Sequence, residues 1–98
     1  MSAVLPLGRP VPNVYMLAGA HRIAAAIELL SREGLTVLSS VQEHPMKPTI
    51  RVRHSIQCDR LIATGEASFY SFGSNDDGRF SEAQFERAGC RVIWTQYP

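Results

Sequence analysis

The sequence predicts an α+β fold in which one N-terminal helix packs on an antiparallel sheet of four to five strands. Two observations support this class. The strongest recurrence of apolar residues at three- and four-residue spacing lies in the first third of the chain, which is typical of an amphipathic helix. After Gly34, short stretches alternate apolar and polar residues instead, which is typical of strands with one buried face. The single helix is then the element available to cover that face.

The predicted helix ends at Glu33, because Gly34 is suited to the left-handed conformation of a helix cap. Its start is open. Asn13 after a proline is a candidate N-cap, whereas Gly19 inside a helix costs about 1 kcal/mol relative to alanine and favours a start at Ala20. The apolar stripe that defines the helix consists of Ala20, Ile23, Ala26, Ile27 and Leu30.

Residues 1–12 contain three prolines and a glycine, and we expect them to form an irregular or disordered arm. Residues 13–98 then form a single α+β domain, because a chain of 98 residues is long enough for one modest core.

Two strands are predicted directly after the helix, over residues 35–43 and 49–57. The second has the clearest alternation in the chain, with Ile50, Val52, His54 and Ile56 on one face and polar residues on the other. The proline-bounded segment 44–48 separates the two strands, so we expect a hairpin.

The C-terminal part predicts a connection over residues 58–65 that includes a short helical turn at 59–62, a strand over 66–72, a turn at 73–78 and a final strand over 90–96. The segment 79–88 has two readings. Ser81 and Gln84 resemble a capping box, whereas Ala83 and Phe85 alternate with polar residues as in a strand. Turn signals on both sides favour the strand, paired with the last one.

The C-terminal sequence FSEAQFERAGCRVIW at residues 80–94 and the segment PTIRV at 48–52 resemble small proteins encoded by proteobacterial phages and prophages. The resemblance extends over roughly residues 13–94 and implies a bacterial cytosolic setting and a final β-hairpin. These relatives mostly have no known function, so no functional residues carry over.

Net charge and the distribution of apolar residues bear on nucleic-acid binding and on membrane contact. The net charge of +1 gives no argument for binding nucleic acid or an anionic membrane surface. No run of residues approaches the roughly 18 apolar residues of a membrane span, and residues 1–7 are too short for a signal peptide. We therefore expect a cytoplasmic protein without membrane contact, in which Cys58 and Cys90 are free thiols.

The residues that carry chemistry do not form a recognisable catalytic or metal-binding motif. His44, His54, Cys58 and Cys90 are the only metal-type set, and they lack the close cysteine pairs of zinc sites. A cysteine nucleophile needs a base within reach and a lowered pKa, and no protease signature surrounds Cys58. We expect no metal, no cofactor and no enzymatic activity.

Arg51 and Arg53 alternate on the polar side of the predicted second strand. Together with Lys47 and Arg91 they could form a basic patch, and Tyr70 or Phe72 could stack on bases beside it. A nucleic-acid-binding module is therefore the alternative function.

The function that we expect first is that of a small non-enzymatic interaction protein, which binds another protein through a sheet face or edge. The aromatic content of the final strands supports it, since aromatic residues and arginine are enriched in protein interfaces. Trp94 is the aromatic residue most suited to the core, so Tyr70 and Tyr97 are the better contact candidates. Leu29 lies off the apolar stripe of the helix and is a further one. The phage resemblance implies a regulator or inhibitor of a host system, such as a defence system.

Overall fold

A computed structural model describes residues 8–44 and 46–98. The chain forms a long helix, two strands, a short helix and three further strands. The elements are α1 (Val11–Arg32), β1 (Val37–Val41), β2 (Thr49–Val52), α2 (Ile56–Ala63), β3 (Ser68–Asn75), β4 (Gly78–Arg87) and β5 (Cys90–Gln96). The predicted α+β class and the five-strand sheet are confirmed.

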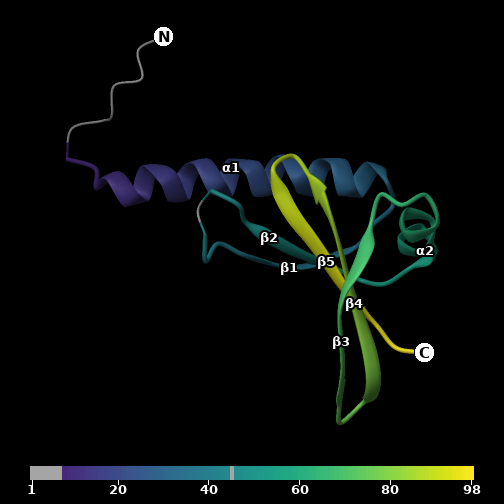
Figure 1. The fold of residues 1–98 in the computed structure, drawn as a ribbon. Helices are drawn as coiled ribbons and strands as arrows, with labels where there is room; N and C mark the ends of the chain where they lie inside the picture. Colours follow the sequence, from purple (N-terminus) through teal and green to yellow (C-terminus); the bar gives the residue numbers. More distant parts are fainter. Residues whose placement is uncertain (1–7, 45) are drawn as a thin grey trace.

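The five strands form one sheet in the order β1-β2-β5-β4-β3. The expected hairpin of β1 and β2 is confirmed, and so is the strand reading of residues 79–88, since β4 pairs antiparallel with both β3 and β5. One pairing differs from the prediction, because β2 and β5 are parallel and the sheet is therefore mixed. The last strand of the chain thus lies in the middle of the sheet (Figure 1).

Helix α1 begins at Val11, earlier than either predicted start and inside the expected arm. Pro10 is its N-cap residue and Pro12 stands in the first turn, where a missing backbone N–H leaves no hydrogen bond unmade. The predicted C-terminal cap is confirmed, since Gly34 has a φ of 80° and the Leu35 N–H donates to the Leu30 carbonyl. The remainder of the expected arm, residues 1–7, lies outside the described residues.

The predicted strand over residues 49–57 is wrong beyond Val52, where the chain leaves the sheet and enters α2. The apparent alternation at His54 and Ile56 is coincidental, and the Ile56 side chain is mostly exposed. Helical spacing decides the conformation instead, because Cys58, Leu61 and Ile62 share one face of α2 and pack on the core. The expected helical turn at 59–62 is thus part of a longer helix.

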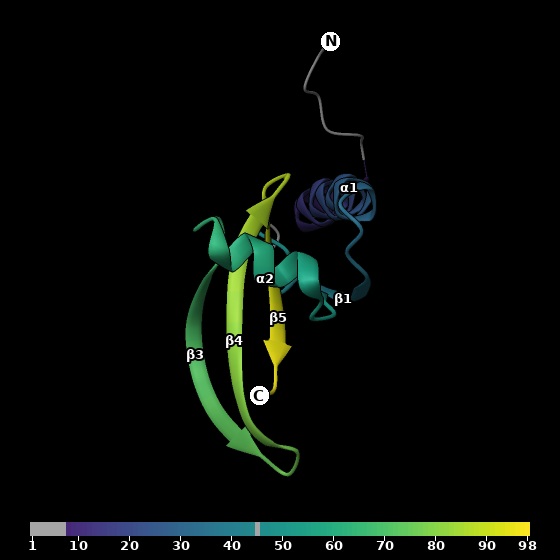
Figure 2. The ribbon, with the colours of Figure 1, turned by 90° about the vertical axis from the view of Figure 1, so that its right-hand side faces the viewer.

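The core lies between the helices and one face of the sheet, which we call the inner face (Figure 2). Leu30 of α1 and Trp94 of β5 are fully buried in it, as expected for Trp94. Other buried members of the cluster are Ala26, Ile50, Val52, Cys58, Ala83, Phe85, Cys90 and Val92.

An ion-pair cluster closes one end of the core. Arg87 of β4 donates two hydrogen bonds, of 2.7 and 2.8 Å, to the carboxylate of Glu33 at the end of α1. It also pairs with Glu66, which precedes β3, and its guanidinium lies 4.9 Å from the centre of the Phe85 ring. These contacts lower the pKa of the Glu33 carboxyl, chiefly through the hydrogen bonds from Arg87, and they join α1 to the sheet.

Candidate functional site

The opposite face of the sheet, which we call the outer face, is not covered by either helix. Strand register places the residues that alternate with the core on this face. They are Arg51 on β2, Glu82, Gln84 and Glu86 on β4, and Arg91, Ile93 and Thr95 on β5. The residues in this list are polar except for Ile93, which is only 7% exposed. This surface carries Arg51 among the predicted contact residues.

Arg51 takes part in a side-chain network across three strands. Its Nη1 donates a 2.6 Å hydrogen bond to the Thr95 hydroxyl, and its Nη2 lies 3.6 Å from a carboxylate oxygen of Glu82. The Thr95 hydroxyl in turn lies 3.3 Å from the same Glu82 oxygen. The predicted basic character of Arg51 is therefore offset locally by a carboxylate.

Tyr70 and Arg91 form a stacked pair on the same face. The Arg91 guanidinium lies 4.6 Å from the centre of the Tyr70 ring, and its Nε donates a 2.8 Å hydrogen bond to Gln84. Tyr70 is 37% exposed, so the ring is held in place by Arg91 and still reaches solvent. A bulge between Phe69 and Ser71 accompanies this arrangement in β3.

Tyr97 follows β5 and lies near the tip of the β3–β4 hairpin. Its hydroxyl accepts a 3.0 Å hydrogen bond from the Asn75 side chain, and its ring contacts Phe80 edge to face at 6.2 Å between centres. Tyr97 is 42% exposed. Side-chain contacts therefore hold both predicted tyrosines in place, and part of each ring is exposed to solvent.

The two remaining contact candidates are not part of this surface. Arg53 follows β2, outside the sheet, and its backbone N–H bonds to the Thr36 carbonyl. Leu29 lies on α1 and is 40% exposed. The expected basic patch is also incomplete, because Lys47 pairs with Glu86 at 2.5 Å and Arg51 pairs with Glu82.

The thiols are buried, and burial raises the pKa of both Cys58 and Cys90. A raised pKa disfavours the thiolate that a nucleophile or a metal ligand requires. His54 Nε2 lies 2.7 Å from an Asp59 carboxylate oxygen, on the loop and first turns of α2. Within residues 8–44 and 46–98, no group of three His, Cys, Asp or Glu side chains is placed to hold a metal ion.

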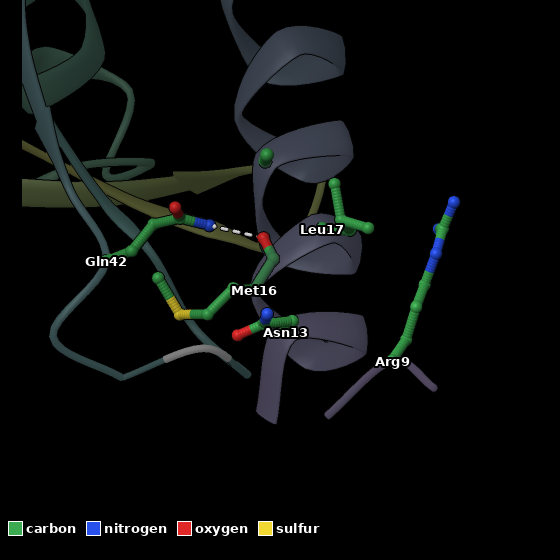
Figure 3. A pocket seen from close by; sticks show the side chains of 6 residues that line it. Arg9, Asn13, Met16, Leu17 and Gln42 are labelled. Carbon is green, nitrogen blue, oxygen red and sulfur yellow. Dashed lines mark hydrogen bonds between the residues drawn. The ribbon is translucent and has the colours of Figure 1, made fainter. Parts of the chain in front are cut away.

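A second exposed surface, which the sequence reasoning did not identify, lies on the N-terminal half of α1. Val11, Tyr15 and Leu17 are each about half exposed there. The Met16 carbonyl accepts a 3.0 Å hydrogen bond from the side chain of Gln42, which directly follows β1 (Figure 3). One feature of the sequence could have indicated this surface. No Asp, Glu, Lys or Arg occurs from Pro10 to His21, whereas an amphipathic helix carries charged residues on its exposed face.

The same segment bears on the expectation of no membrane contact. By length and composition alone α1 could cross a bilayer, although the sequence contains no uninterrupted run of about 18 apolar residues. This is weak evidence, because core helices of soluble proteins and signal sequences have the same properties.

A family model described as an uncharacterised protein matches residues 7–97. This agrees with the expectation that the relatives have no known function, and the match shows no link to phages or prophages. No curated protein and no solved structure matches the chain.

Proposed function

The chain belongs to this family of uncharacterised proteins, and we propose that it is a non-enzymatic module that binds another protein through the outer face of its sheet. The observation that supports this most is the stacked pair of Tyr70 and Arg91. Tyrosine and arginine are the residue types that most often dominate binding energy at protein interfaces. Because Gln84 and the stacking already hold these two side chains, they lose little conformational entropy when a partner binds.

The charges of the outer face favour a protein over a nucleic acid. A phosphate backbone is bound by lysine and arginine side chains that are free to replace counterions. Here Lys47 and Arg51 are paired with Glu86 and Glu82, so both signs of charge are interspersed. A mixed surface of this kind matches the polar rim of a protein interface and repels a polyanion through its carboxylates.

A phage-encoded regulator or inhibitor of a host system, such as a defence system, is the finer function that the C-terminal resemblance supports. Its partner is then a host or phage protein in the bacterial cytoplasm. Burial raises the pKa of the two thiols, which disfavours either one as a nucleophile.

The test is a pull-down from a bacterial lysate with nuclease and about 0.3 M salt, a concentration at which phosphate-dominated binding weakens steeply. We expect a specific protein to be retained by the native chain and lost with Tyr70→Ala and with Arg91→Ala. Tyr15→Ala is the matched control, because it removes a tyrosine of similar exposure from α1. Recovery of nucleic acid alone, lost at that salt and with Arg51→Ala and Arg53→Ala, would show that the nucleic-acid alternative is correct.

A further inference from the structure

One flank of α1 carries exposed residues that have no role in the fold or in the outer face. Asn13, Leu17, Ala20, Ala24 and Glu28 follow one another at three- and four-residue spacing and are all exposed. We call these five residues the α1 flank. Figure 2, which looks nearly along α1, shows that the sheet and α2 lie to one side of this helix.

Arg9 extends the α1 flank beyond the N-terminus of the helix. It lines a shallow hollow of about 660 Å³ together with Asn13, Met16, Leu17, Ala20 and Gln42. Figure 3 shows Arg9 and Leu17 on the same side of the helix. The flank therefore has a cation at its N-terminal end, apolar residues in the middle and the Glu28 carboxylate towards its C-terminal end.

The residues of the α1 flank, together with Arg9, can pair with the same residues of a second copy that runs antiparallel. If two α1 helices lie antiparallel with the midpoint between Ala18 and Gly19, Arg9 faces Glu28 of the other copy. In the same register Asn13 faces Ala24, and Leu17 faces Ala20. Opposite charges then meet at both ends of the paired helices. A large side chain meets a small one on each side of the midpoint.

We infer that a second copy of this chain occupies the α1 flank, with the two α1 helices antiparallel about a two-fold axis. Such a contact is isologous, so each pair occurs twice, and Leu17 of each copy enters the hollow beside Ala20 of the other. Glu28 is available for this contact, because its pair with Arg32 is 3.4 Å long and both side chains are about 70% exposed.

The opposite flank of α1 offers no such pairing. There Ala18, Ala25 and Leu29 follow Val11 at helical spacing, and the charged residue among them, Arg22, donates a 2.8 Å hydrogen bond to the Met46 carbonyl. Antiparallel pairing on that side therefore brings no opposite charges together. The self-complementary surface is the one that contains Leu17.

The test is sedimentation equilibrium of the full chain. A single pair of helices buries less than about 1,200 Å² in total, so we expect a dimer with a dissociation constant in the micromolar range. Leu17→Glu should leave only monomer. The matched control is Leu29→Glu, which introduces the same charge at a similarly exposed leucine of α1 and should leave the dimer intact.

Charge reversal tests the register without a change in the apolar contact. Arg9→Glu and Glu28→Arg should each raise the dissociation constant by about tenfold, and the double variant should restore it to within about threefold of the native value. Far-ultraviolet circular dichroism should be the same for all variants.

Three results would overturn the inference. The first is a native chain that stays monomeric up to about 1 mM, a concentration that detects even a weak pairing. The second is a dimer lost with Leu29→Glu and kept with Leu17→Glu. The third is a dimer that the double charge reversal fails to restore. A monomeric chain that floats with phosphatidylcholine vesicles would show that lipid covers α1 instead.

Discussion

The two faces of the sheet are built from alternate residues of the same strands, yet they differ in what holds them together. On the inner face Val92 and Trp94 are fully buried beneath the helices. On the outer face Arg91 and Thr95, their neighbours in sequence, bond to other side chains and remain partly exposed. Burial of apolar area dominates stability, whereas partly exposed polar pairs contribute little to it. The inner face therefore decides whether the chain folds, and the outer face contributes little to stability.

The two faces should differ most in how much a substitution lowers the free energy of unfolding, and two adjacent residues of β5 test this. Trp94→Ala removes a fully buried ring and should lower the free energy of unfolding by about 3–5 kcal/mol. Thr95→Ala removes hydrogen bonds to Arg51 and Glu82 and should cost less than about 1 kcal/mol. Urea denaturation of both variants measures this. Equal midpoints would contradict the division of roles.

A smaller effect is expected from the helix that covers the inner face. Ile27 is partly buried against the core, so Ile27→Ala should cost about 2 kcal/mol. His21 is exposed on α1, and His21→Ala should change stability by less than about 0.5 kcal/mol. Thermal melts of the two variants should differ clearly, and similar melts would mean that α1 is not held through its apolar stripe.

The ion-pair cluster at the end of the inner face should make stability depend on pH. Arg87 lowers the pKa of Glu33 in the folded protein below the ordinary value of about 4.3. Its contribution is therefore complete above that value and is lost as the pH falls through the lower pKa of the folded state. Glu33→Gln should cost about 1–2 kcal/mol at pH 7, and the cost should decrease as the pH falls below the ordinary pKa of about 4.3. A cost that stays constant between these pH values would assign it to packing.

The smallest effect is expected on the outer face. A double-mutant cycle on Arg51 and Glu82 should give a coupling energy of less than about 1 kcal/mol, because both side chains are partly exposed. The coupling should fall further in about 1 M salt, where the screening length is near 3 Å. A coupling above about 2 kcal/mol would show that this face also stabilises the fold.

The sequence was sufficient to predict the elements whose signal is local. Gly34 ends α1 through a conformation that glycine adopts easily, and the turn signals around residues 79–88 identified β4. Residues 53–57 were misread because their alternation over a few positions imitates a strand. The helical spacing of Cys58, Leu61 and Ile62, which begins just beyond, identifies α2 instead.

Features that depend on distant residues were not predicted. Nothing near β2 indicates that it pairs with β5, about forty residues later, and in parallel orientation. For the same reason Arg51 and Tyr70 were identified as contact candidates without the partners Glu82 and Arg91 that hold them. The sequence identified candidate contact residues, while the sheet order decided which side chains lie beside them.

The central position of β5 has a consequence for how the chain folds. This strand is the last of the five along the chain, and it separates the β1–β2 hairpin from the β3–β4 hairpin. Neither hairpin can join the other until residues 90–96 are available, so the sheet closes late, over contacts of long sequence separation. Until then β2 and β4 each lack the strand that they pair with at the centre of the sheet. A nascent chain that stops before Cys90 therefore contains most of the residues of the core and none of its central strand.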